Sequence, residues 1–178
     1  MLKVQELKTT PSLELFSELV ELLQDAVNDG ASLGWLTAPG TKEARNYWTG
    51  VLEAVGRGER RLFIATDDHV CAGAIQLLLP QKANAAHRGE VQKLMVHSQF
   101  RRRGIGRALV TALEAAAAAD GLALLVLDVR TGDVAQQLYE NLQWERVGEI
   151  PDFVRSASGR LDSTTVYYRK LAPAAGEF

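Results

Sequence analysis

The sequence predicts a single domain of mixed α and β structure, and three observations support this. Apolar residues recur at helical spacing along residues 11–27 and 105–116. Short apolar runs such as residues 61–66 and 122–129 have the length and composition of strands. The chain has 178 residues, of which 47% are hydrophobic, and this suffices for one buried core. We therefore expect residues 1–171 to form one domain and residues 172–178 to be a disordered tail.

The N-terminal half is predicted to hold three strands and two helices. A first strand covers residues 2–7, and the first helix begins with Thr10 as its N-cap and Pro11 in its first turn. Gly30 ends that helix. After a loop at residues 31–41, a second helix is expected over residues 42–55. Two strands follow, at residues 61–66 and 72–79, around a turn at Asp67 and Asp68.

The C-terminal half centres on a strand–loop–helix–strand unit. A strand at residues 90–96 precedes a helix whose apolar positions are 105, 108, 109, 112, 113 and 116. Residues 122–129 are nearly all apolar, as in a strand that is buried on both faces. Thr131 or Asp133 caps a short helix that runs to residue 142. The last strands are expected at residues 145–150 and 165–171, with a loop at residues 151–163 between them.

Composition excludes several classes of function. The net charge of −2 gives no global basis for binding nucleic acid or an anionic membrane. The single cysteine, Cys71, cannot form an internal disulfide, and three histidines without ligand spacing predict no metal site. The N-terminus lacks the apolar core of a signal peptide, and no apolar run is long enough to span a bilayer. We expect a soluble cytoplasmic protein.

The chemistry is predicted to lie in residues 96–109. A strand ends at Val96, a basic loop follows, and a helix starts near Gly104. Free N–H groups and the helix dipole favour a phosphate at such a point, and Gly104 and Gly106 allow close approach of the backbone. The loop lacks the Lys-Ser/Thr of a P-loop, and Val110 replaces the third glycine of a Rossmann fingerprint. By spacing alone, phosphate binding and a simple basic turn both remain open.

Three segments together resemble the GNAT superfamily of acetyltransferases. Residues 101–106 match its [QR]-x-x-G-x-[GA] motif, residues 90–96 its preceding strand, and residues 135–144 its A-x-x-[LF]-Y-x-x-x-G-F segment. The resemblance implies the GNAT acyl-CoA N-acyltransferase fold, with a central mixed, mostly antiparallel sheet flanked by helices. It also implies N-acetyltransferase activity with acetyl-CoA as co-substrate and no metal. Gln143 and Trp144 depart from the Gly-Phe of the motif, and Gly132 replaces a frequent asparagine.

The resemblance also implies which residues bind acetyl-CoA. The pantetheine arm would lie along Leu94, Met95 and Val96, where the N–H near Met95 would face the thioester carbonyl. The pyrophosphate would lie on the loop after that strand. The full set of implied cofactor-binding residues is Leu94, Met95, Val96, Arg101, Arg102, Arg103, Gly104, Ile105, Gly106, Arg107, Asp133, Gln136 and Tyr139.

Three residues are implied to be catalytic. Tyr139 aligns with the family tyrosine that protonates the departing thiolate, and a tyrosine is protonated at neutral pH without special tuning. A tyrosine on a short amphipathic helix can also simply pack. Glu90 and Asp128 are joint candidates for the general base, or for binding the substrate ammonium. Asp128 can instead cap the following loop or pair with an arginine.

The acceptor is the least determined part. Trp35, Tyr47 and Trp48 lie near the first helices, where the family builds its acceptor pocket, and Phe153 lies in the predicted late loop. Segments 30–34, 90–96, 147–151, 159–161 and 165–171 resemble the tabtoxin-resistance branch of the superfamily, which implies acetylation of the free amine of a small toxin or antibiotic. Acetylation of a protein or peptide, and a non-catalytic acetyl-CoA-binding domain, remain as alternatives. A homodimer is a further expectation.

Overall fold

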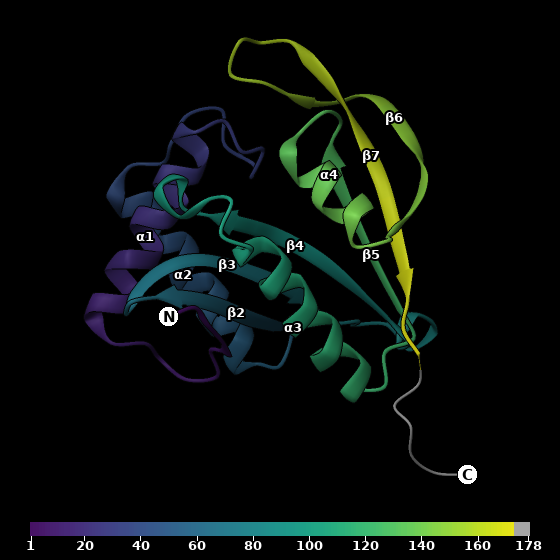
Figure 1. The fold of residues 1–178 in the computed structure, drawn as a ribbon, viewed down its shortest axis with the longest axis horizontal. Helices are drawn as coiled ribbons and strands as arrows, with labels where there is room; N and C mark the ends of the chain where they lie inside the picture. Colours follow the sequence, from purple (N-terminus) through teal and green to yellow (C-terminus); the bar gives the residue numbers. More distant parts are fainter. Residues whose placement is uncertain (173–178) are drawn as a thin grey trace.

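The computed structural model describes residues 1–172, and they form one twisted sheet with helices on both of its faces (Figure 1). Six of the residues in the expected tail, 173–178, lie outside this described part. The helices and strands are β1 Lys3–Glu6, α1 Leu13–Asn28, α2 Thr41–Gly56, β2 Arg60–Asp67, β3 Val70–Leu78, β4 Arg88–Val96, α3 Ile105–Ala119, β5 Leu124–Arg130, α4 Val134–Asn141, β6 Glu145–Arg155 and β7 Leu161–Lys170.

The sheet has seven strands in the order β1-β2-β3-β4-β5-β7-β6. Every neighbouring pair is antiparallel except β4 and β5, which are parallel. This confirms the predicted mixed, mostly antiparallel sheet. The parallel pairing covers only Arg88–Glu90 of β4 opposite Leu124–Val126 of β5. Beyond these residues the two strands diverge, and Figure 1 shows the gap widening away from the shared end.

Two hydrophobic clusters hold the helices against the sheet. α1 and α2 cover one face, where Leu19, Leu23 and Trp48 are fully buried. α3 covers the other face with Ile105, Leu109 and Leu113, the positions expected from its helical period. Gly73 of β3 permits this close approach, because a Cβ there would lie 3.0 Å from the Ile105 side chain and 3.1 Å from the Leu109 side chain.

Three local predictions are corrected by the structure. The first helix begins at Leu13, and its N-cap is Ser12, whose Oγ accepts a hydrogen bond from the Leu15 N–H at 3.2 Å; Thr10 lies before the cap. The predicted loop at residues 151–163 is mostly strand. A register shift between Ile150 and Val154 accommodates Pro151, which has no N–H to donate, and β6 then continues to Arg155.

The third correction concerns β5, which is buried on one face only. Leu125, Leu127 and Val129 are buried, whereas Asp128 is exposed. The strand lies beside the opening between β4 and β5, so its second face borders a cavity and not a second layer of core. No helix within residues 1–172 is long and apolar enough to cross a membrane.

Candidate active site

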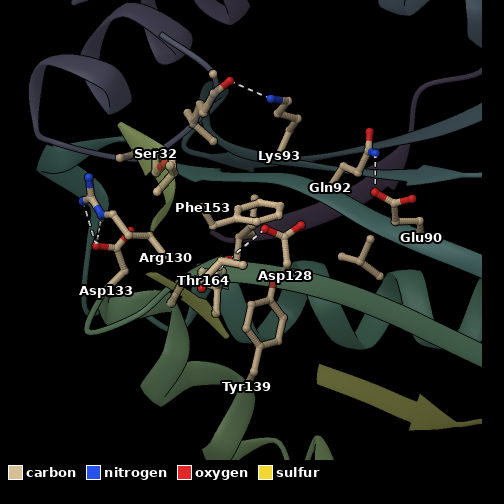
Figure 2. A pocket seen from close by; sticks show the side chains of 18 residues that line it. Ser32, Glu90, Gln92, Lys93, Asp128, Arg130, Asp133, Tyr139, Phe153 and Thr164 are labelled. Atoms are coloured by element: carbon tan, nitrogen blue, oxygen red, sulfur yellow. Dashed lines mark hydrogen bonds and ion pairs between the residues drawn. The ribbon is translucent and has the colours of Figure 1, made fainter. Parts of the chain in front are cut away.

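A cavity of about 450 Å³ lies where β4 and β5 diverge. Its walls come from β4 and β5, from α4, from the loop at residues 31–34, and from Phe153 and Val154 of β6. Figure 2 shows side chains of these elements directed toward a common space. The short parallel pairing therefore creates the cavity, because each strand beyond it lacks the other as a neighbour.

A β-bulge shapes the β4 wall of the cavity. Gln92 lies opposite Gln76 of β3, and Met95 lies opposite Ala74. β4 therefore advances three residues along the sheet where β3 advances two, so β4 contains one extra residue. Lys93, inside the bulge, has a φ of +53°, which is unusual for a residue other than glycine. Bulges turn side chains and backbone groups away from the regular alternation of a strand. The β4 edge that faces the cavity has no strand partner after Glu90, so its backbone groups are available there.

A basic loop connects the end of β4 to α3. Gly104 is the N-cap of α3 with a φ of +78°, and no side chain caps the helix there. Arg101 pairs with Asp29, and Arg103 lies 3.3 Å from Asp67, whereas Arg102 and Arg107 are exposed. Backbone donors at the start of α3, together with the Arg102 and Arg107 guanidinium groups, are the groups of this loop that could hold an anion.

Gly106 brings this loop, β4 and α4 together. A Cβ added to Gly106 would lie 3.0 Å from Leu138 of α4 and 3.8 Å from Val96 of β4. The first turn of α3 therefore packs close to the end of the diverging strand and to the helix that carries Tyr139. This contact places the basic loop next to β4 and α4, the two elements that contribute Leu94 and Tyr139 to the cavity.

Tyr139 lines the cavity from α4 and is only 4% exposed. Its ring packs edge-on against Trp144 with 5.4 Å between centroids. Burial raises the pKa of the Tyr139 hydroxyl well above its usual range, and the nearby Glu114 carboxylate raises it further. No hydrogen bond joins the hydroxyl to another of the described residues, and Figure 2 shows it directed toward Asp128. It is therefore a neutral, available proton donor.

Two carboxylates enter the same cavity from the two diverging strands. Glu90 of β4 accepts a hydrogen bond from Gln92 Nε2 at 2.6 Å. Gln92 in turn accepts a hydrogen bond from Arg60 at 2.9 Å. Asp128 of β5 accepts a hydrogen bond from the Thr164 hydroxyl at 2.9 Å. Each carboxylate is thus held by a neutral donor and is free of a direct cationic partner within the described chain.

Residues 19–143 match the Acetyltransferase (GNAT) family, which is more than half of the 178 residues. The chain belongs to this family. An uncharacterized N-acetyltransferase from the hisH-hisA intergenic region of Azospirillum brasilense is 36% identical over 115 residues, which are 64% of this chain and 67% of that protein. This GNAT chain is accordingly an N-acetyltransferase.

Solved structures share the GNAT fold across nearly the whole chain. The Salmonella typhimurium protein yncA, determined with its cofactor acetyl-CoA, has a TM-score of 0.78 at 16% identity and covers 100% of this chain and 98% of its own. The ribosomal-protein-alanine N-acetyltransferase of Brucella melitensis also has a TM-score of 0.78, at 19% identity, with 95% and 99% covered. At these identities the likeness concerns the fold alone.

The structure brings some of the residues that the sequence singled out into the cavity, including all three predicted catalytic residues. Glu90, Leu94, Asp128, Asp133 and Tyr139 all line the cavity. Three other predicted cofactor-binding residues make structural contacts within the protein. Met95 and Ile105 are 1% and 2% exposed and belong to the core, and the Gln136 side chain accepts a hydrogen bond from the Gly132 N–H at 2.8 Å.

Three predicted acceptor-binding residues lie in different environments. Phe153 lines the cavity, as its position near an acceptor requires. Trp48 is fully buried beneath α1 and lies away from the cavity surface, so the structure does not support its contact with a substrate. Trp35 is half-buried, and its Nε1 donates to Glu43 at 2.8 Å. An aromatic residue on an amphipathic helix has the same sequence signature in a core as in a pocket wall.

Sequence reasoning missed Lys93 and Arg130, which both line the cavity. Lys93 donates to the Leu33 carbonyl oxygen at 2.6 Å, and burial lowers the pKa of its ammonium, with Arg60 lowering it further and Asp128 raising it. Arg130 pairs with Asp133 at 2.7 Å. A strand pattern alone does not show that a bulge turns Lys93 toward this space.

Proposed function

We propose that this GNAT protein transfers the acetyl group of acetyl-CoA to the primary amine of a small molecule. One observation carries the proposal. The cavity between β4 and β5 holds a neutral tyrosine and two carboxylates, and the basic loop that follows β4 lies next to it in the fold. An anionic acyl donor and a cationic amine need these two kinds of surface side by side.

The residues present fit acetyl-CoA. Its phosphates suit the α3 N-terminus and the arginines of residues 101–107, with Gly104 in the left-handed conformation that this turn requires. Its pantetheine arm is an extended amide chain, which can hydrogen-bond to the unpartnered edge of β4 near Leu94. The structure of yncA with acetyl-CoA shows that a protein of this fold accommodates the molecule.

The reaction needs two proton transfers and a fixed donor to the thioester oxygen. The amine nitrogen attacks the thioester carbonyl carbon, a C–N bond forms, and the C–S bond breaks. Tyr139 would donate its proton to the departing sulfur, and its buried hydroxyl is fully protonated at neutral pH. Glu90 or Asp128 would take the proton that the amine loses, directly or through a water, and backbone N–H groups at the β4 bulge would stabilise the oxyanion.

The shape of the cavity favours a small acceptor over a protein chain. The loop at residues 31–34 and the β6 residues Phe153 and Val154 line it from two sides, and its volume of about 450 Å³ suits a small molecule. A toxin or antibiotic with a free amine, as in the tabtoxin-resistance branch, is the acceptor we propose within this class. A protein N-terminus would need a groove that continues past these walls.

The test follows release of coenzyme A from acetyl-CoA with tabtoxinine-β-lactam, amino acids, polyamines, aminoglycosides and a short peptide. We expect turnover with at least one small amine and none with the peptide. Turnover with the peptide alone would replace the small-molecule acceptor by a protein. Silence across the panel, together with no thermal stabilisation by acetyl-CoA, would refute the proposed function.

A further inference from the structure

The cavity carries charges that its own side chains do not neutralise. Its charged residues are Glu90, Lys93, Asp128, Arg130 and Asp133. Arg130 and Asp133 form an ion pair with each other. Within residues 1–172 the other three have no ion-pair partner, and Figure 2 shows them around the same space. Two carboxylates and one ammonium are thus left for a ligand.

Lys93 is the single cation among these three. Its Nζ donates to the Leu33 carbonyl oxygen at 2.6 Å and lies 5.8 Å from the centroid of the Trp35 ring, and both groups are neutral. An ammonium has three N–H donors, so two remain for a ligand. The bulge in β4 gives Lys93 its φ of +53° and places it on the cavity wall. Asp128 acts on Lys93 only from beyond ion-pair distance, so the ammonium has no direct counter-charge among the described residues. A half-buried charge of this kind is stabilised when a ligand supplies a direct partner.

Acetyl-CoA does not supply that counter-charge at this position. The pantetheine arm next to β4 is uncharged, and the phosphates have their own basic surface at residues 101–107. An anionic group that bonds directly to Lys93 would therefore belong to the acceptor. A molecule with an ammonium near Glu90 and Asp128 and an anionic group on Lys93 matches all three free charges.

We propose that Lys93 binds a carboxylate of the acceptor, so that the acceptor is an amino-acid-like molecule with an amine and a carboxylate. The inference rests on the proposed function, because it names the acceptor class of the same site. Lys93 acts as a specificity-determining residue. Its bond to the Leu33 carbonyl oxygen orients the side chain and leaves two N–H donors unused.

The experiment compares acceptors that differ only in the carboxylate. The pairs are L-lysine with cadaverine, L-leucine with isoamylamine, and L-phenylalanine with 2-phenylethylamine; phenylalaninamide keeps the size of phenylalanine without the charge. Coenzyme A release gives kcat and KM for each. The variant is Lys93→Met, which keeps an unbranched side chain at this left-handed position. Lys93→Arg restores a charge, and Lys42→Met, exposed on α2, is the matched control.

We expect the wild type to prefer the carboxylated member of at least one pair. Lys93→Met should lower kcat/KM for that acceptor about 10-fold to 100-fold, mainly through KM, the effect of losing one charge-assisted hydrogen bond. The partner without a carboxylate should keep its kcat/KM within about twofold. Lys93→Arg should retain part of the preference, and Lys42→Met should match the wild type.

Two results would overturn the inference while the proposed function stands. One is equal turnover of both members of every pair by the wild type. The other is an equal loss for both members in Lys93→Met, which would mean that Lys93 only fastens the loop at residues 31–34. Failure of every amine, carboxylated or not, would refute the proposed function itself. Thermal unfolding of each variant verifies that a loss of turnover is not a loss of fold.

Discussion

Replacing Tyr139 with phenylalanine tests the proton donor of the site with little effect on the fold. The substitution removes only a hydroxyl that makes no hydrogen bond to the described residues. It keeps the ring that packs on Trp144 at 5.4 Å and on Tyr167 at 6.4 Å between centroids. We therefore expect the free energy of unfolding to change by less than about 0.5 kcal/mol. Loss of a general acid should lower kcat by about 10²-fold to 10⁴-fold, or about 2.7 to 5.4 kcal/mol of barrier.

The assay is single-turnover release of coenzyme A at saturating amine, so that product release does not mask the chemical step. KM for acetyl-CoA should stay within about threefold, because the hydroxyl is asked to act mainly in the transition state. Tyr168→Phe is the matched control, since that hydroxyl bonds to Glu145 on the exposed side of β7. Unchanged single-turnover rates in Tyr139→Phe would remove Tyr139 from the mechanism and leave it as a packing residue.

The remaining predictions concern the carboxylates, the phosphate loop and the sheet edge. Glu90→Gln should lower kcat, and Asp128→Asn should mainly raise KM for the amine. Gly104→Ala places a Cβ at a φ of +78° and should cost about 1 kcal/mol of stability and raise KM for acetyl-CoA. Glu6 accepts hydrogen bonds from Arg61 at 2.8 and 2.7 Å, and this partner lowers the pKa of the Glu6 carboxyl. That ion pair stabilises the fold above the unfolded pKa of about 4.3 and is lost as pH falls through the lower folded pKa. Glu6→Gln should thus cost about 1 kcal/mol at pH 7 and almost nothing near pH 2.

The two carboxylate substitutions have a control within the chain. Glu14→Gln, exposed in the first turn of α1, should leave both kinetic constants unchanged. If Glu90→Gln and Asp128→Asn both leave kcat and KM unaltered, neither residue is a base or an ammonium ligand. Equal KM for acetyl-CoA in Gly104→Ala and the wild type would separate the loop geometry from phosphate binding. Urea denaturation at pH 7 and near pH 2 measures the Glu6 effect.

The fold and the backbone geometry at the start of α3 could be predicted because local physics determines them. Gly104 adopts the left-handed conformation that only glycine takes readily, and the apolar period that begins at Ile105 buries α3. Such features depend on residues that are close together in the sequence. Tyr139 was found only through its resemblance to a family segment, because helical spacing alone does not distinguish a packed tyrosine from one that lines a cavity.

The residues that were missed depend on distant contacts. Lys93 reaches the cavity because the β4 segment from Gln92 to Met95 is one residue longer than the β3 segment from Gln76 to Ala74 that pairs with it. This register depends on a strand about 20 residues away in sequence. The sequence predicts Trp48 to line the acceptor pocket, but the residue lies in the core. It is buried because it packs with α1 residues in one hydrophobic cluster. The loop expected at residues 151–163 became strand because pairing with β7 outweighs the local effect of Pro151.

The two carboxylates are held differently, and this suggests different roles. Glu90 is bonded to Gln92, which is oriented by Arg60, and Arg60 also donates to the fully buried Gln76 at 2.6 Å. This series of hydrogen bonds fixes the orientation of the Glu90 side chain from within the sheet. A general base needs such a fixed orientation toward the proton that it accepts. Among residues 1–172, Asp128 has only the Thr164 hydroxyl as a hydrogen-bond partner, and its side chain is exposed at the cavity. This placement suits attraction of an ammonium from solvent. Because Glu90 is held by a series of hydrogen bonds and Asp128 by a single one, we expect Glu90→Gln to lower kcat and Asp128→Asn to raise KM for the amine.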